Sequence, residues 1–292
     1  MKISKISLNE MITNKMKNTS KPVLITGCSS GIGLSAAKYL QQQGFRVIAS
    51  VRNKKDIGIF SDLDIECIQL DLTDEDSINS AVNYIKEYAP NIYGIVNNGA
   101  YGQPGAVEDL SRDALIEQFQ TNVFGTHSLT QKLIPLLRKN NQGRIIQISS
   151  ILGFVGAPMR GAYNASKYAL EGLSDTLRIE LKDTGIKVSI IQPGPIESQF
   201  RPNAYKAFEK HIDIKQSQYS TIYDQVYDRL HSKKKARFTL PADAVSKRIF
   251  HALSSKKPKI RYWVTVPTIV MGVLTKICPE AWRDKLIGHQ SN

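Results

Sequence analysis

Short apolar runs alternate with amphipathic segments between residues 21 and 192. The runs VLIT, RIIQIS and VSIIQ are apolar over consecutive positions rather than at every second one, which is typical of strands covered on both faces. Such runs predict six strands, at residues 22–26, 45–51, 65–70, 93–97, 144–149 and 187–192. Between them, apolar residues recur at helical spacing, which predicts helical segments at residues 32–43, 74–88, 112–138 and 163–182.

This alternation of strands and helices is the pattern of an α/β protein. It predicts a single-domain Rossmann fold, in which a doubly wound parallel sheet carries helices on both faces. Residues 21–292 contain no internal repeat and no interdomain linker, so one nucleotide-binding domain is expected there. Residues 1–20 are polar and basic without a continuous apolar stretch, which predicts a flexible N-terminal extension rather than a secretory signal.

The regular alternation of predicted strands and helices ends after Pro193. Residues 194–241 form an insertion rich in Tyr, Lys and Gln, and residues 256–292 form a C-terminal tail. The elements expected in this part are helices around residues 203–212, 220–230 and 243–253 and a last strand at residues 260–266. Because the insertion follows the last strand of the alternating series, we expect it to shape the substrate side of the fold.

A net charge of +13 over 292 residues marks a basic protein. Nucleic acid, an anionic membrane surface or acidic ligands would each suit such a charge. No nucleic-acid-binding module accompanies it, so we interpret the charge as a generally basic surface and expect no nucleic-acid partner. Three cysteines without a CxxC pair argue against disulfides and cysteine-ligated zinc, and the scattered histidines predict no metal site. A reducing, cytoplasmic location fits best.

A glycine-rich turn, TGCSSGIG, follows the first apolar run and opens the first helix. Gly27, Gly31 and Gly33 have the spacing GxxxGxG and not the GxGxxG of the general dinucleotide fingerprint. The physics is shared, because glycines let the backbone turn tightly and approach a pyrophosphate at a helix N-terminus. The alternative is a simple strand–helix loop, and the strand–turn–helix context favours the nucleotide site.

This turn resembles the coenzyme motif of the short-chain dehydrogenase/reductase family, and further motifs of that family follow in the same order. The matching positions are Asp71, the NNGA segment at residues 97–100, Asn122, Ser150, Tyr163, Lys167 and Pro193-Gly194. The resemblance covers roughly residues 22–198. TGCSSGIG, together with VRN at the end of the second strand, is similar to the 17-beta-hydroxysteroid and retinol dehydrogenase branch. The resemblance also implies a homodimer or homotetramer.

The resemblance implies a cofactor site assembled from many short segments. Its residues would be Gly27, Ser29, Ser30, Gly31, Ile32, Gly33, Arg52, Asp71, Leu72, Asn98, Gly99, Ala100, Tyr163, Lys167, Pro193, Gly194, Ile196 and Ser198. Asp71 would contact the adenine. One departure is that NNAG of the family reads NNGA here. Both small residues permit close approach to the cofactor, but the residue that tolerates positive φ has moved by one position, which leaves the loop shape open.

Arg52 bears on the choice between NADP(H) and NAD(H). NAD-specific enzymes of this architecture place an acid near the end of the second strand, where it binds the ribose 2′-hydroxyl. This strand ends in Ala49-Ser50-Val51-Arg52 and has no acid there. A guanidinium suits a 2′-phosphate, and Ser30 could hydrogen-bond the same group, so we predict NADP(H) over the alternative of an exposed surface arginine.

Tyr163 and Lys167 are four residues apart and therefore share one face of the predicted helix. A free tyrosine has a pKa near 10, and a nearby ammonium should lower that pKa into the range of acid–base work. Ser150 follows the fifth strand at the carboxyl end of the sheet, where its hydroxyl can stabilise the substrate oxygen. Ser149 is the neighbouring alternative, and the spacing to the tyrosine in the family that the chain resembles selects Ser150. The resemblance implies that Asn122 holds a water that links the lysine to solvent, and that Lys167 binds the nicotinamide ribose.

Aromatic residues are frequent in the insertion, and they either line an apolar pocket or pack its helices. They are Phe200, Tyr205, Phe208, Tyr219, Tyr223 and Tyr227. The apolar stretch at residues 264–274 is interrupted by Pro267 and is far shorter than the ~20 residues that span a bilayer. It predicts a strand and helix that close the pocket or a subunit interface, with peripheral membrane contact by the tail as the alternative.

Together these features predict an NADP(H)-dependent oxidoreductase, of the carbonyl reductase type, that interconverts a hydrophobic aldehyde or ketone and its alcohol. Tyr163 would be the acid/base residue. The alternative is a non-catalytic NADP(H)-sensing or membrane-peripheral binding protein on the same fold. Since both Tyr163 and Lys167 are present, the enzyme is favoured.

Overall fold

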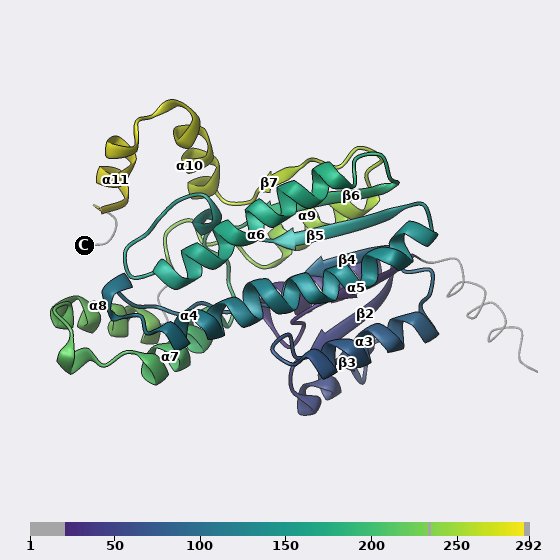
Figure 1. The fold of residues 1–292 in the computed structure, drawn as a ribbon, viewed down its shortest axis with the longest axis horizontal. Coiled ribbons are helices and arrows are strands. Elements are labelled where there is room, and N and C mark those ends of the chain that lie inside the picture. The colour runs from purple at the N-terminus through teal and green to yellow at the C-terminus, as the bar shows by residue number, and fades with distance from the viewer. Residues whose placement is uncertain (1–20, 233–234, 289–292) are drawn as a thin grey trace, which may run out of the picture.

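The computed structural model describes residues 21–232 and 235–288, with side chains through Lys285, and residues 1–20, the predicted extension, lie outside this part. The described residues contain a seven-stranded sheet of order β3-β2-β1-β4-β5-β6-β7, in which every neighbouring pair is parallel (Figure 1). The strands are β1 (Pro22–Ile25), β2 (Arg46–Val51), β3 (Glu66–Gln69), β4 (Gly94–Asn97), β5 (Gly143–Ile148), β6 (Ile186–Gln192) and β7 (Arg261–Trp263). The predicted doubly wound Rossmann fold is confirmed.

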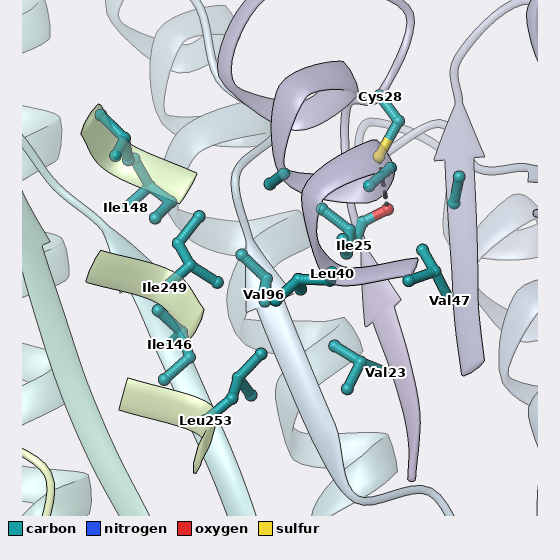
Figure 2. Close-up of a cluster of buried hydrophobic side chains, with 14 of the residues drawn as sticks. Val23, Ile25, Cys28, Leu40, Val47, Val96, Ile146, Ile148, Ile249 and Leu253 are labelled. Atoms are coloured by element: carbon teal, nitrogen blue, oxygen red, sulfur yellow. Dashed lines mark hydrogen bonds between the residues drawn. The ribbon is translucent and has the colours of Figure 1, made fainter. Parts of the chain in front are cut away.

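Helices cover both faces of this sheet because consecutive strand residues point to opposite faces. Val23 and Ile25 of β1 pack into a core beneath α2 (Gly31–Gln42) and α9 (Asp243–Ser254), which Figure 2 shows from close by. Leu24, between them, belongs to a second core beneath α3 (Glu75–Tyr88) and α5 (Thr126–Lys139). This double burial explains why the strands are apolar at consecutive positions.

The helical stretch predicted at residues 112–138 consists of three segments. Its first part is α4 (Arg112–Phe119), a π-helical segment η3 (Gln120–Gly125) follows, and α5 completes it. The π-helical segment contains Asn122, and such segments are frequent at functional sites. The helical segments predicted over this stretch are therefore present, and the break between them falls at Asn122.

The last strand is shorter than predicted. β7 ends at Trp263, and Val266, which was assigned to the strand, begins helix α10 (Val266–Ile277). Pro267 lies in the first turn of α10, where its missing N–H costs no hydrogen bond. The apolar stretch thus closes the sheet and then becomes helical, and several of its side chains, Ile269, Val270 and Val273, are exposed.

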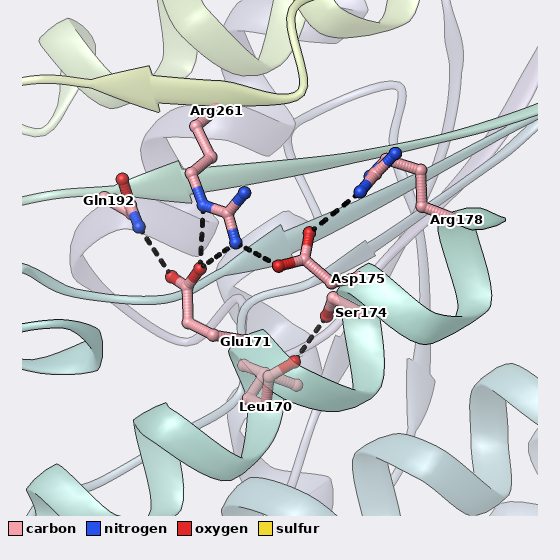
Figure 3. A network of polar contacts seen from close by, with 7 residues as sticks. All are labelled: Leu170, Glu171, Ser174, Asp175, Arg178, Gln192 and Arg261. Carbon is pink, nitrogen blue, oxygen red and sulfur yellow. Dashed lines mark hydrogen bonds and ion pairs between the residues drawn. The ribbon is translucent and has the colours of Figure 1, made fainter.

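Strand β7 is fixed to helix α6 (Gly161–Glu180) by an ion-pair network, shown in Figure 3. The Arg261 guanidinium donates to Glu171 Oε2 at 3.1 Å and to Asp175 Oδ2 at 2.6 Å. Gln192 of β6 donates to the other oxygen of Glu171 at 2.9 Å. These bonds hold the end of β6 and the edge strand against the helix that carries Tyr163 and Lys167.

The predicted insertion forms α7 (Phe200–His211), a short 3₁₀ turn and α8 (Ser220–His231). Phe208 and Tyr223 are fully buried between these helices, and Tyr223 donates to Asp109 at 2.5 Å while accepting from the amide of Ala106 at 2.9 Å. These two aromatic residues therefore pack the insertion onto the domain. No helix in the described part of the chain combines the length and the apolar character that crossing a membrane requires.

Candidate active site

Four predicted catalytic residues lie at the carboxyl end of the sheet, and all four are buried. Ser150 follows β5, and Tyr163 and Lys167 lie on consecutive turns of α6. Asn122 reaches the same helix from the π-helical segment η3 through a 3.0 Å bond from its Nδ2 to Ser166 Oγ. The structure thus brings together side chains from three segments, as ligand sites in this architecture require.

Asn122 is fixed by the chain itself. Its Nδ2 also donates to the carbonyl of Tyr101 at 3.0 Å, and its Oδ1 accepts from the amide of Tyr101 at 3.1 Å. Both donors of the amide are thereby used. The side chain locks the loop after β4 to the residue that precedes Lys167, which is a positioning role that the sequence alone did not indicate.

Lys167 is buried and holds one defined position. Its Nζ donates to the carbonyl of Ile148, at the end of β5, at 2.7 Å and lies 5.8 Å from the centre of the Tyr163 ring. Burial lowers the pKa of Lys167 to about 8, and the charge of Glu171 opposes this shift. The ammonium is thus charged at neutral pH and close to its titration range.

The pKa of Tyr163 corrects a prediction. Burial raises it to about 12, and the hydrogen bond with Ser150 and the charge of Arg160 only partly oppose this shift. The expected lowering by Lys167 was wrong here, because desolvation of the phenolate outweighs the neighbouring charges. Tyr163 is therefore a protonated phenol over the whole neutral range, and this form can donate a proton.

The glycine-rich turn has the close packing that a nucleotide cradle needs. Gly27 has φ +69°, and a Cβ on Gly33 would lie 2.2 Å from the carbonyl oxygen of Gly27. Asn98 supports the turn, since its Nδ2 donates to the carbonyls of Thr26 and Gly27 at 2.9 and 3.0 Å. Helix α2 begins there without a side-chain cap from Ser30 and without an acid in its first turn. Its open N-terminal amides fit an anionic pyrophosphate.

Alanine at Gly33 is expected to disrupt this cradle. The added Cβ would lie 2.2 Å from the carbonyl oxygen of Gly27 and 2.6 Å from Asn98 Nδ2, so the turn must shift, at a cost of about 1–3 kcal/mol and with weaker binding of a nicotinamide coenzyme. Gly172→Ala is the matched control, because nothing lies within 4 Å of its Cβ and alanine favours the interior of α6. Urea unfolding and NADPH titration would check this, and equal behaviour of the two variants would contradict it.

The NNGA segment keeps a regular backbone. Gly99 is not among the described glycines with positive φ, so exchanging glycine and alanine creates no strain at Ala100. The amides of Asn98 and Gly99 both donate to Thr26 Oγ1, at 2.9 and 2.8 Å. Thr26 therefore fixes the end of β4 against the turn, and sequence reasoning assigned it no role although it begins the motif.

The remaining predicted cofactor residues surround the same edge of the sheet. The Asp71 carboxylate accepts hydrogen bonds from the amide and the hydroxyl of Thr73. Leu72 is buried, and its side chain would lie 3.1 Å from a Cβ added to Gly99. Ser198 packs near Gly31. A Cβ added to Gly31 would lie 3.0 Å from the Cβ of Ser198. The other predicted cofactor residues either flank the glycine-rich turn or follow β6, and all of them are partly or fully buried. They are Ser29, Ile32, Pro193, Gly194 and Ile196.

Arg52 is exposed directly after β2. Its guanidinium makes no ion pair within the described residues, and its carbonyl accepts from Gln69 Nε2 at 3.3 Å. The charge of Arg52 lowers the pKa of Tyr101, although burial dominates and raises that pKa to about 12. Arg52 thus lies at the carboxyl end of β2, within electrostatic reach of Tyr101 after β4.

Phe200 is a site residue that sequence reasoning placed only in a group of aromatics. Its ring packs edge-on against Tyr163, with centroids 5.2 Å apart, and α7 thereby reaches the catalytic phenol. A separate cavity of about 840 Å³ lies between α6, β7 and α10 and is lined by Phe154, Trp263 and Lys276 among others. That cavity does not include Tyr163, so it is not the catalytic site.

Comparisons with known proteins agree with this geometry. A family model described as short chain dehydrogenase matches residues 21–208. The chain is 39% identical over 279 residues to the oxidoreductase YbbO of Escherichia coli (strain K12), covering 95% of this chain and 97% of that protein. It is 31% identical over 272 residues to the NADPH-dependent 3-dehydrocapnine reductase of Ornithobacterium rhinotracheale, covering 90% and 94%. A solved short-chain dehydrogenase from Streptomyces avermitilis shares the fold, with a TM-score of 0.75 and 24% identity over 94% of this chain and 99% of that chain.

Proposed function

Because this chain belongs to the short-chain dehydrogenase family, we propose that it is an NADP(H)-dependent enzyme that interconverts a carbonyl compound and its alcohol. Membership makes a nicotinamide-dependent oxidoreductase the general activity. The proposal adds NADP(H) as the coenzyme, an aldehyde or ketone as the reacting group, and Tyr163 as the acid/base residue. The observation that carries it is the convergence of Ser150, Tyr163 and Lys167 at the carboxyl end of the sheet, where the glycine-rich turn also follows its strand.

The bound nicotinamide would supply or accept the hydride. Tyr163 would donate its phenolic proton to the carbonyl oxygen, and its raised pKa keeps that proton available at neutral pH. Ser150 would hydrogen-bond the same oxygen and stabilise the charge that develops on it. Lys167, held by the carbonyl of Ile148, would place a positive charge beside the phenol as it loses its proton. The protonated phenol is thus the form of Tyr163 that reduction requires.

Two features support NADP(H). Arg52 is exposed and without an ion pair within the described residues, at the strand end where an acid would select NAD(H). The relative from Ornithobacterium rhinotracheale is named for its dependence on NADPH. A 2′-phosphate would give the Arg52 guanidinium a bidentate partner.

We propose a substrate with an apolar body. Phe200 packs on Tyr163, and Ile151 and Leu152 follow Ser150 in a short 3₁₀ turn and are only partly buried. An NADPH-consumption screen of matched aldehydes and ketones, apolar and polar, tests the proposal. Consumption with apolar carbonyl compounds is expected, and its absence with every carbonyl in the screen would refute the enzyme function.

The pH profile of reduction should have a falling limb near the pKa of Lys167. Below a pH of about 8 its ammonium is charged, and above that pH the charge is lost, whereas Tyr163 remains protonated. We therefore expect kcat/KM to fall as the pH rises through about 8. In Lys167→Arg the guanidinium stays charged, so any remaining activity should not decline there. An unchanged limb in that variant would exclude Lys167 as its source.

A further inference from the structure

The cavity of about 840 Å³ at the edge of the sheet is bounded by side chains from several elements. Phe154 lines it from the end of the 3₁₀ turn after β5, Trp263 from β7 and Ile269 from α10. Sites for small molecules typically have volumes of roughly 300–1,000 Å³ and combine apolar walls with a few polar groups. Because Tyr163 does not line this cavity, a ligand bound there would be separate from the reacting carbonyl.

Helix α10 forms the outer wall, and packing fixes it in place. The hydroxyls of Thr265 and Thr268 at its start are fully buried and lie 3.0 Å apart. Gly272 lets the helix approach Trp263, since a Cβ at this position would lie 2.5 Å from the indole. Lys276, one turn further along, has its Nζ 5.5 Å from the centre of the same ring. The indole and the ammonium thus form a wall that is in place before any ligand binds.

Gln192 supplies an unused hydrogen-bond acceptor to this cavity. Its side chain is 2% exposed, it lines the cavity, and its Nε2 donates to Glu171 Oε1 at 2.9 Å. The opposite amide assignment would set an oxygen against the carboxylate, so the free atom is the oxygen. Figure 3 shows this oxygen directed away from Glu171, and it has no hydrogen-bond partner within the described residues. A buried acceptor without a partner costs free energy, which a ligand with an N–H or O–H donor would recover.

The cavity also carries positive charge that no acid balances. Arg248, Lys259 and Lys276 line it, and within residues 21–232 and 235–285 none of the three forms an ion pair. Glu171 is the one acid among the described residues that line the cavity, and both of its oxygens already accept hydrogen bonds (Figure 3). Cations without an acid partner around an apolar cavity favour an anionic ligand.

We propose that this cavity is a second ligand site, which binds a small amphipathic anion that also carries a hydrogen-bond donor. The apolar body of the ligand would lie against Phe154 and Trp263, and its anionic group would face Lys259 and Lys276. Its N–H or O–H would donate to Gln192 Oε1. The site does not depend on the proposed catalytic function, because none of these residues takes part in it.

Tryptophan fluorescence reports on this cavity directly. The chain has two tryptophans, and Trp282→Phe leaves Trp263, in the cavity wall, as the only one. We would titrate this variant of the full chain with N-octanoylglycine, N-octanoyl-β-alanine and N-octanoyl-γ-aminobutyrate, which place the carboxylate at increasing distances from the N–H. N-octanoylethanolamine phosphate is the phosphate arm. We expect a saturable change in Trp263 emission with at least one probe, and a matching affinity in calorimetry on the wild type. No binding by any probe would overturn the proposal.

Matched ligands separate the parts of the interaction. Methyl esterification of the best-binding probe removes its charge, and an ester oxygen in place of its N–H removes only the donor. Each change should weaken binding by about tenfold, as the loss of a charged or buried hydrogen bond gives. Equal binding of all three compounds would contradict the site, because neither Gln192 nor the cations would then contribute.

Variants assign these preferences to residues. Lys259→Gln and Lys276→Gln should each reduce the preference for the anion over its methyl ester by about fivefold, and Gln192→Met should remove the preference for the N–H over the ester oxygen. Lys257→Gln is the matched control, since Lys257 is exposed close to Lys259 in the chain but does not line the cavity, and it should keep both ratios. Ratios that stay unchanged in all the cavity variants would refute the assignment.

Binding beside Tyr163 is the outcome to be distinguished from binding in the cavity. Phe200→Ala changes the packing on Tyr163 and leaves the cavity residues in place. A probe whose affinity falls in Phe200→Ala and not in the cavity variants binds at the catalytic site, and the second site is then refuted. All of these readouts measure binding, so a failure to reduce any carbonyl compound would refute the proposed enzyme and leave the second site standing.

Discussion

Replacing Tyr163 with phenylalanine is expected to lower kcat for carbonyl reduction by about two to four orders of magnitude, the usual contribution of a positioned acid or base. The change removes the phenolic oxygen, which is the only atom of this side chain that can donate a proton. The ring and its packing on Phe200 remain. NADPH binding should change little, because the glycine turn and Arg52 lie on other elements.

Single-turnover kinetics and NADPH fluorescence titration would separate these effects. Tyr168→Phe is the matched control, since Tyr168 lies on the same helix but its side chain is 47% exposed. It should keep the activity of the wild type. Full activity of Tyr163→Phe would refute the assignment of the acid, whereas lost NADPH binding would mean that the hydroxyl holds the coenzyme rather than the proton.

The sheet could be predicted from sequence because burial on both faces leaves a strong pattern. Strands such as β5 and β6 are nearly continuous apolar runs, and their observed bounds differ from the predicted ones by one residue. The catalytic set could be recognised because its members lie at fixed places on these elements. Ser150 directly follows a strand, and Tyr163 and Lys167 are one helical turn apart.

The features of the site that could not be predicted from sequence depend on contacts between distant segments. The raised pKa of Tyr163 results from burial to which Phe200 contributes, and no local pattern indicates that contact. The π-helical turn at Asn122 is likewise set by packing, because its amide must reach both Tyr101 and Ser166. A local signal did exist for the end of β7, since Pro267 with Thr265 before it is typical of a helix start.

Arg52→Asp is expected to reverse the coenzyme preference. The substitution removes the guanidinium proposed to pair with the 2′-phosphate and supplies the acid that would accept from a free 2′-hydroxyl. Loss of a charged hydrogen bond together with new repulsion should lower the ratio of kcat/KM for NADPH to that for NADH by about 100-fold. Arg52→Gln, which only removes the charge, should show a smaller effect.

The measurement is the ratio of kcat/KM for the two coenzymes, taken at low and at high salt. Lys54→Asp is the matched control, because Lys54 is exposed two residues further on and its replacement changes the net charge by the same amount. If both variants shift the ratio equally and salt abolishes the shift, long-range attraction of a more negative coenzyme explains the preference. A shift confined to Arg52 that persists at high salt requires a direct contact, since close pairs are screened far less than distant charges. Helix α2 and the glycine turn are unchanged in these variants, so both should still bind a dinucleotide, and the 2′-position alone should decide which one.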